Sequence, residues 1–164
     1  MSAHPTIRPA TRDDVPLILT LVRELATYEK LAQDVVATEE TLATSLFGRR
    51  PAAEVLIAEL HGAAVGFALF FPNYSTFLGK AGIYLEDLFV RPGARGRGVG
   101  RALFSRLAAV ATERGCGRLE WAVLDWNVSA MGFYEKLGAA AMDDWTIYRL
   151  TGDALSSLGD EVET

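Results

Sequence analysis

One stretch, residues 82–114 with the sequence GIYLEDLFVRPGARGRGVGRALFSRLAAVATER, most constrains how this chain can fold. Its first part, residues 83–90, is rich in β-branched, aromatic and leucine residues, which predicts a buried strand. Glu86 and Asp87 interrupt that strand. Because burying a carboxylate costs free energy, their presence there indicates a functional role.

A turn rich in arginine and glycine leads from this strand into a helix. After a break at Arg91-Pro92-Gly93 the sequence is Arg95-Gly96-Arg97-Gly98-Val99-Gly100, and apolar residues then recur with helical spacing at Val99, Leu103, Phe104, Leu107 and Ala108. Glycines let backbone N–H groups curl toward an anion, and a helix N-terminus adds about half a positive charge. The turn therefore predicts a phosphate-binding loop. The alternative is a solvated basic turn whose glycines cap the helix.

Two familiar glycine patterns do not match this turn. GxGxxG would need glycine at a position held by Arg101 or Leu103, and GxxxxGK[ST] would need lysine where Val99 stands. A nucleoside triphosphate or dinucleotide loop is therefore disfavoured.

The composition favours one domain over residues 1–164, since half of the chain is apolar and can form one sizeable core. The N-terminal residues lack the apolar segment of a secretory signal, and no window reaches the ~18 apolar residues of a membrane span. We therefore expect a cytoplasmic protein without membrane association.

Metal binding and cysteine catalysis are both disfavoured. A metal site would have to use His4, His61 and carboxylates, and the two histidines lie in an N-terminal end and a turn. Cys116 is the only cysteine, and it lies between two glycines with no nearby histidine to activate it.

The charge distribution is uneven. Residues 91–106 contain five arginines and no acid, so the rest of a chain with net charge −5 carries ten more acids than bases. The basic patch suits an anionic cosubstrate, and the acidic remainder suits a cationic acceptor, although an ordinary acidic surface is the alternative. Nucleic acid would require a broader basic face.

Periodicity and turn signals predict the remaining elements. Thr11 with Asp14 resembles a capping box, Thr38 is a helix N-cap, and His61-Gly62 is a tight hairpin turn. An aromatic loop is expected over 72–80 and a mobile acidic tail from Thr151. We expect further strands over 7–9, 54–60, 63–71, 118–124 and 146–150, and further helices over 15–29, 39–47 and 128–137.

Arg95-x-x-Gly98-x-Gly100 resembles the acetyl-CoA pyrophosphate loop of the GNAT superfamily of N-acetyltransferases. The resemblance extends along nearly the whole chain, through Ile7-Arg8-Pro9-Ala10-Thr11, Tyr84-Leu85-Glu86-Asp87, Asp125-Trp126-Asn127 and Gly132-Phe133-Tyr134-Glu135-Lys136-Leu137-Gly138-Ala139. Together these motifs look like the diamine acetyltransferase branch, which includes spermidine/spermine and thialysine acetyltransferases. The resemblance implies an α/β (α+β) GNAT fold, a mixed central sheet flanked by helices with the fourth and fifth strands splayed.

The same resemblance implies acetyl-CoA as cosubstrate and no metal. The backbone N–H groups of Leu88, Phe89 and Val90 would polarise the acetyl carbonyl in an oxyanion-hole role. Asn127 and Tyr134 are seven residues apart and so share a helix face, which in the family borders the pantetheine arm. The loop residues implied to bind the cosubstrate are Arg95, Gly96, Arg97, Gly98, Val99, Gly100 and Arg101.

The resemblance also implies the acid–base groups. A lysine-like amine has a pKa of ~10.4, so only about one molecule in 10³ is neutral at pH 7, and a proton acceptor matters. Glu86 would take that proton through water, Asp87 would hold the cationic acceptor, and Tyr134 would protonate the departing thiolate. Tyr134 as a surface aromatic is the alternative. Strand alternation sends Glu86 and Asp87 to opposite faces unless the strand bulges.

Four further residues are implied to contact the acceptor: Tyr28, Glu29, Ser75 and Phe77. For Tyr28 and Glu29 the alternative is a solvated helix end. Polyamine-preferring relatives carry an acid where Ser75 stands and tryptophan where Phe77 stands, so this loop is more similar to the thialysine-acetylating type. The branch also implies a homodimer.

The sequence thus predicts an enzyme that transfers acetyl from acetyl-CoA to a primary amine of a small di- or polyamine or lysine-like amino acid. One alternative is acetylation of a protein or an antibiotic. The other is a CoA-binding module without catalysis, which the presence of Glu86 and Tyr134 disfavours.

Overall fold

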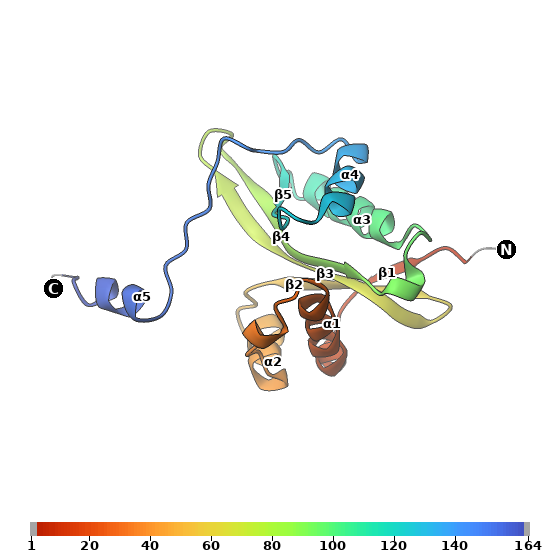
Figure 1. The fold of residues 1–164 in the computed structure, drawn as a ribbon, viewed down its shortest axis with the longest axis horizontal. Helices are drawn as coiled ribbons and strands as arrows, with labels where there is room; N and C mark the ends of the chain where they lie inside the picture. Colours follow the sequence, from red (N-terminus) through yellow and green to blue (C-terminus); the bar gives the residue numbers. More distant parts are fainter. Residues whose placement is uncertain (1–2, 163–164) are drawn as a thin grey trace. The chain divides into compact units, whose positions relative to one another are not determined.

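The structure is a computed structural model that describes residues 3–162. The chain forms two compact units, one up to Leu124 and the other from Asp125; that they constitute one domain stays a prediction. The first unit is built on a five-stranded sheet, whose strands lie in the order β1 (Thr6–Pro9), β2 (Glu54–Leu60), β3 (Ala63–Ser75), β4 (Lys80–Val90) and β5 (Leu119–Trp121) (Figure 1).

The sheet is mixed, because β1 to β4 pair antiparallel and β4 pairs with β5 in parallel. Helices α1 (Val15–Tyr28) and α2 (Glu39–Phe47) lie on one side of it, and α3 (Val99–Glu113) lies on the other (Figure 1). Single 3-10 turns occur over Arg12–Asp14, Ala32–Asp34 and Pro92–Ala94. The predicted α/β fold, a mixed sheet flanked by helices, is confirmed.

Two apolar layers hold the sheet between its helices. Ile18 and Leu21 of α1 are fully buried against Ile57 and Phe67 of the sheet. On the other face, α3 buries the predicted stripe except Ala108, which is exposed. At 100° per residue Ala108 lies at the rim of that stripe, whereas Ala111 lies within it and is buried instead.

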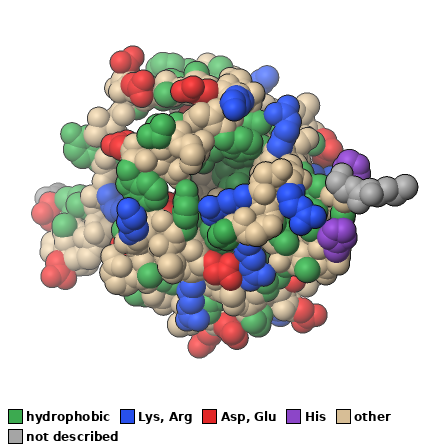
Figure 2. Space-filling view, turned by 45° about the vertical axis from the view of Figure 1, so that its right-hand side comes forward, with side chains coloured by type: hydrophobic (Ala, Val, Ile, Leu, Met, Phe, Trp, Pro, Cys, Tyr) green, Lys and Arg blue, Asp and Glu red, His purple; other side chains and the backbone are tan. Residues whose placement is uncertain are grey.

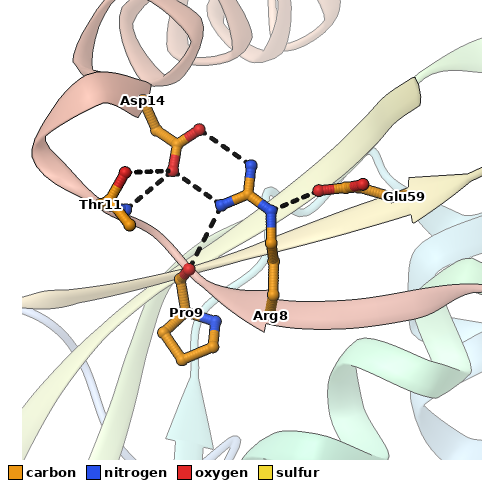
Figure 3. Close-up of polar contacts among 5 residues, drawn as sticks. All are labelled: Arg8, Pro9, Thr11, Asp14 and Glu59. Atoms are coloured by element: carbon orange, nitrogen blue, oxygen red, sulfur yellow. Dashed lines mark hydrogen bonds and ion pairs between the residues drawn. The ribbon is translucent and has the colours of Figure 1, made fainter. Parts of the chain in front are cut away.

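Arg8 anchors the beginning of the chain (Figure 3). Its guanidinium donates two hydrogen bonds to the Asp14 carboxylate, at 2.8 and 2.9 Å, and a third to Glu59 on β2. Asp14 also accepts the Thr11 N–H at 2.7 Å, the contact expected of a capping residue. The Arg8 guanidinium lowers the pKa of Asp14 to about 2, so the Asp14 carboxylate stays ionised at neutral pH.

The hairpin between β2 and β3 turns at His61 and Gly62, both with positive φ, as predicted. The loop expected over 72–80 is wrong in extent, because β3 continues to Ser75 and only residues 76–79 form the turn. Pro72 is tolerated there for a physical reason. Pairing with β2 ends at Phe70, so beyond that point β3 has one neighbour and Pro72 lies at an edge where no N–H donor is needed.

The strand expected over 118–124 is shorter than predicted. Its parallel ladder has three pairs and ends where Leu85 faces Trp121. Residues 122–124 therefore have no strand partner within the part of the chain that the structure describes, and they are irregular.

The second unit contains α4 (Val128–Lys136) and α5 (Gly152–Gly159). Helix α4 agrees with the prediction, and Gly138 follows it with φ 92°. The strand expected over 146–150 is wrong, because these residues pair with no strand of the described chain. Within the tail from Thr151, Gly152–Gly159 form α5, and the expected mobility of the tail stays a prediction. None of the helices in residues 3–162 is long and apolar enough to cross a membrane.

Candidate active site

Strand β4 contains a β-bulge at Glu86. On β3, Leu69 faces Asp87 while the next residue, Phe70, faces Leu85, so Glu86 is the extra residue without a partner. A bulge breaks the alternation of side chains and re-aims the residue beside it. This is the condition under which Glu86 and Asp87 can act at the same site, and the register shift supplies it.

Beyond the bulge, β4 offers backbone N–H groups at an edge that β5 does not cover. The Arg91 N–H donates to the Val65 carbonyl of β3 at 2.8 Å. Because direction alternates along a strand, the N–H groups of Val90 and Leu88 point the other way, and that of Phe89 points to β3. The Val90 carbonyl confirms this direction, since it accepts the Arg95 Nε–H at 3.0 Å on that same side.

Glu29, Glu86 and Asp87 form an acidic cluster at this edge. Burial, and then the charges of Glu86 and Glu29, raise the pKa of Asp87 to about 6. Burial and the Glu86 charge likewise raise the pKa of Glu29. Glu86 is exposed, and the other two side chains are half-buried. Because neighbouring carboxylates raise the pKa of Asp87 and of Glu29, a cation would bind favourably beside them.

Local chain geometry places Glu29 in this cluster. Helix α1 ends at Tyr28, and the Glu29 N–H closes its last turn on the Leu25 carbonyl at 2.9 Å. Lys30 then adopts φ 62°, and the Leu31 N–H donates to the Ala26 carbonyl, so the chain turns sharply after Glu29.

The arginine–glycine turn is shaped to accept an anion. Gly96 and Gly98 have φ of 73° and 80°, and a Cβ at either position would meet no protein atom within 4 Å. Space therefore remains over the loop backbone at the N-terminus of the 15-residue helix α3. Val99 is buried as the first helical residue, while Arg97 and Arg101 are exposed. These features fit a bound pyrophosphate, which needs backbone N–H groups and positive charge.

Arg95 lies differently from the other loop arginines. Its guanidinium carbon is 4.6 Å from the centre of the Tyr28 ring and 5.8 Å from that of Phe89. The first residue of the loop is thereby in contact with the end of α1. Sequence reasoning missed this contact, because positions 28 and 95 share no local pattern.

Asn127 and Tyr134 lie in the second unit, on α4. Asn127 is the N-cap, and its side-chain oxygen accepts the Ala130 N–H at 3.4 Å. Tyr134 is half-buried with its ring 6.0 Å from that of Phe133. Asn127 precedes the first helical residue, so that its side chain shares a face with Tyr134 stays a prediction.

Ser75 and Phe77 lie at the hairpin between β3 and β4, away from the bulge. The Ser75 side chain is buried, and its hydroxyl accepts the Leu78 N–H at 3.2 Å within the turn. Phe77 is fully exposed. Glu86 follows Lys80, the first residue of β4, by six positions, which is about 20 Å of extended strand. Within one chain the structure therefore does not bring Ser75 or Phe77 to the acidic cluster.

Within residues 3–162, no group of three or more histidine, cysteine, aspartate or glutamate side chains is arranged to hold a metal ion.

The chain belongs to the Acetyltransferase (GNAT) family, whose model matches residues 20–139. It is 41% identical to a thialysine N-epsilon-acetyltransferase from Bos taurus, over 95% of this chain and 98% of the relative. It is 38% identical to the L-ornithine N5-acetyltransferase NATA1 from Arabidopsis thaliana, over 93% of this chain and 86% of the relative. An integron cassette protein from the V. cholerae mobile metagenome has a similar structure, with a TM-score of 0.80 and 28% identity over 98% of this chain and 99% of that one.

The protein is therefore an N-acetyltransferase that acts on amines, and the family implies acetyl-CoA as the acyl donor. The predicted membership of the diamine and thialysine branch is confirmed.

The raised pKa of Asp87 predicts a pH-dependent stability. The folded protein binds an extra proton between about pH 4 and pH 6, so the free energy of unfolding should fall as pH rises through that window. Asp87→Asn removes this loss. It should therefore be more stable than wild type by about 1–2 kcal/mol above pH 6 in urea unfolding, and no more stable at pH 4.

Asp34→Asn is the matched control, since Asp34 is exposed on a 3-10 turn. It should leave the pH profile of stability unchanged. An Asp87→Asn variant that gains as much at pH 4 as at pH 7.5 would show that Asp87 does not carry the effect.

Proposed function

We propose that this protein transfers the acetyl group of acetyl-CoA to the side-chain amine of a small cationic substrate, a lysine-like amino acid or a diamine. The observation that carries the proposal is the β4 bulge, which gathers Glu86 and Asp87 beside Glu29. Relatives named for thialysine and ornithine, both amino acids with a side-chain amine, support this substrate class.

Asp87 and Glu29 hold the cationic amine in this proposal. Each is half-buried, and each has its pKa raised by burial and by a neighbouring carboxylate. A bound ammonium group relieves the repulsion and lowers the pKa of Asp87 toward its ordinary value. Affinity for the amine therefore increases as pH rises through about 6, where Asp87 ionises.

Glu86 takes the proton that the ammonium group must lose before it can attack. Its exposure allows water to lie between its carboxylate and the amine, so the proton moves through that water. Asp87, in contrast, is half-buried and binds the ammonium group without taking its proton.

Acetyl-CoA, when bound, supplies the acetyl group on a thioester. The N–H groups of Leu88 and Val90, which point to the uncovered edge of β4, donate to the acetyl carbonyl oxygen as negative charge develops there. The amine nitrogen bonds to the carbonyl carbon as the C–S bond breaks. The Tyr134 hydroxyl gives its proton to the departing sulfur, and Asn127 lies beside the pantetheine arm.

The loop holds the pyrophosphate mainly through its backbone. Gly96 and Gly98 leave the backbone before α3 open, while Arg97 and Arg101 contribute charge from exposed positions. Neither Gly96 nor Gly98 could be replaced without placing a side chain at positive φ.

A homodimer is part of the proposal. Phe77 lies about 20 Å along β4 from Glu86, so it can reach an acceptor site only in another copy, whereas the buried Ser75 hydroxyl holds the turn that presents Phe77. Phe77 is 101% exposed, and in the second unit Ile147 and Tyr148 are 73% and 93% exposed. Figure 2 shows hydrophobic side chains exposed among charged ones. Ile147 and Tyr148 are adjacent in sequence, and in the proposed dimer a second copy would cover such exposed apolar side chains.

The activity is tested by measuring release of CoA thiol with thialysine, lysine, ornithine, spermidine, an aminoglycoside and a peptide with a free N-terminus. The amino acids with a side-chain amine should be the best acceptors. Glu86→Gln should lower kcat/KM by about 100-fold at pH 7 and by less at high pH, where more amine is already neutral. Tyr134→Phe should lower kcat by about 10- to 1000-fold with acetyl-CoA affinity unchanged.

Glu113→Gln, an exposed substitution on α3, serves as the control and should match wild type. Preference for the aminoglycoside or the peptide would favour the alternative substrates. Binding of CoA without release from any acceptor would indicate a module without catalysis. A Glu86→Gln deficit equal at every pH would assign Glu86 to holding the amine.

The pyrophosphate loop is tested by a matched pair of glycine substitutions at the two ends of α3. Gly98 and Gly115 have φ of 80° and 69°, and a Cβ at either meets open space. Gly98→Ala and Gly115→Ala should each lose about 1–2 kcal/mol of unfolding free energy from left-handed backbone strain. Only Gly98→Ala should also weaken acetyl-CoA binding, by about tenfold, if roughly 1.4 kcal/mol of contact is lost. Equal calorimetric affinities in the two variants would refute the loop assignment.

The homodimer is tested by sedimentation velocity at micromolar concentration, where the protein should have about twice its chain mass of 17.8 kDa. Tyr148→Asp should raise the dissociation constant by about tenfold or more, because buried aromatic residues dominate interfaces. Val36→Asp changes an equally exposed apolar residue outside these surfaces and should leave assembly unchanged. A wild-type monomer with full activity would overturn the assembly.

A further inference from the structure

We infer that Tyr28 is a positioning residue that acts through Arg95, so that occupation of the pyrophosphate loop strengthens binding of the amine at the acidic cluster. The inference rests on the proposed function. It concerns which residues of this chain would couple the affinities of the two substrates, and it starts from the contact between Tyr28 and Arg95.

Arg95 is held at two points. Its Nε–H donates to the Val90 carbonyl at 3.0 Å, at the end of β4. The face of its guanidinium lies on the Tyr28 ring, with the central carbon 4.6 Å from the ring centre. One arginine therefore joins the strand that offers the oxyanion-hole amides to the last residue of α1.

The arrangement leaves part of Arg95 available to an anion. A guanidinium has five N–H donors around its edge, and stacking uses its face. The Val90 carbonyl takes the Nε donor, so donors on the two terminal nitrogens remain at the edge. Arg95 also begins the loop, three residues before Gly98. An anion bound at the edge fixes the plane of the guanidinium without displacing the ring.

Restraining the Tyr28 ring also restrains Glu29, the next residue, which belongs to the acidic cluster. Tyr28 is directly followed by Glu29, a member of the acidic cluster, and the chain turns away at Lys30 with φ 62°. The Glu29 N–H is itself bonded to the Leu25 carbonyl, so a restrained Tyr28 also restrains the backbone that carries the Glu29 carboxylate. Binding of CoA therefore includes the entropy cost of ordering Tyr28 and Glu29. The amine no longer bears that cost, so it binds more tightly when CoA is present.

The expected coupling is modest and reciprocal. A cation–π contact at a partly exposed site is weak by itself. We therefore expect bound CoA to increase the affinity for the amine by about 5- to 20-fold, which is in the lower part of the usual range for coupled sites. Thermodynamic linkage requires the amine to strengthen CoA binding by the same factor.

The experiment measures the dissociation constant of the best acceptor amine by calorimetry, without and with saturating CoA, which carries the pyrophosphate but no acetyl group to transfer. In wild type the amine should bind about 5- to 20-fold more tightly with CoA. Tyr28→Leu should reduce this ratio to about one, whereas Tyr28→Phe, which keeps the aromatic face, should preserve it. The ratio is informative because a general structural defect would weaken both measurements alike.

Two further variants complete the test. Tyr74→Leu removes another exposed tyrosine, on β3, and should leave the ratio at the wild-type value. Arg95→Lys keeps the charge but loses the planar stack, so it should lower the ratio toward one even if Tyr28→Leu fails to fold.

The outcomes separate this inference from the proposed function. A wild-type protein that acetylates no amine contradicts the function itself. An active wild type with a ratio of one or below, or a ratio that survives both Tyr28→Leu and Arg95→Lys, overturns the coupling and leaves the function standing.

Discussion

The register shift of β4 at Glu86 is the constraint on which the rest of the site depends. Because Glu86 has no partner on β3, Asp87 is re-aimed and a second carboxylate joins the first. The parallel ladder with β5 ends one residue earlier, at Leu85. The N–H groups of Leu88 and Val90 are consequently left at an uncovered edge, where a ligand rather than a strand can accept their hydrogen bonds.

The acidic cluster shows how function limits stability in this fold. Burial and two like charges act on Asp87 in the same direction, and its pKa rises to about 6. At neutral pH the protein therefore holds an ionised, half-buried carboxylate beside two others, at a cost in folding free energy that a cationic substrate would offset. The Arg8 network differs, because there the guanidinium lowers the pKa of Asp14 and the charges stabilise the fold.

The two substrates would be recognised by different means. In the proposed function, the loop would bind the donor through backbone geometry at Gly96 and Gly98 together with positive charge, and the acidic cluster would bind the acceptor through carboxylate side chains. Arg95 stands between them, since it begins the loop and stacks on Tyr28 beside Glu29. Its position gives the fold a direct route by which occupation of one site can affect the other.

The sequence by itself determined the features that depend on neighbouring residues. Thr38 caps α2, His61 and Gly62 turn the first hairpin, and Gly98 adopts positive φ before α3, each for a local steric or hydrogen-bonding reason. Tertiary structure alone decided which strands find partners. It extends β3 through Pro72, stops β5 at Trp121 and leaves residues 146–150 without a strand. It also places the bulge at Glu86, because register is a property of two strands and no single segment encodes it.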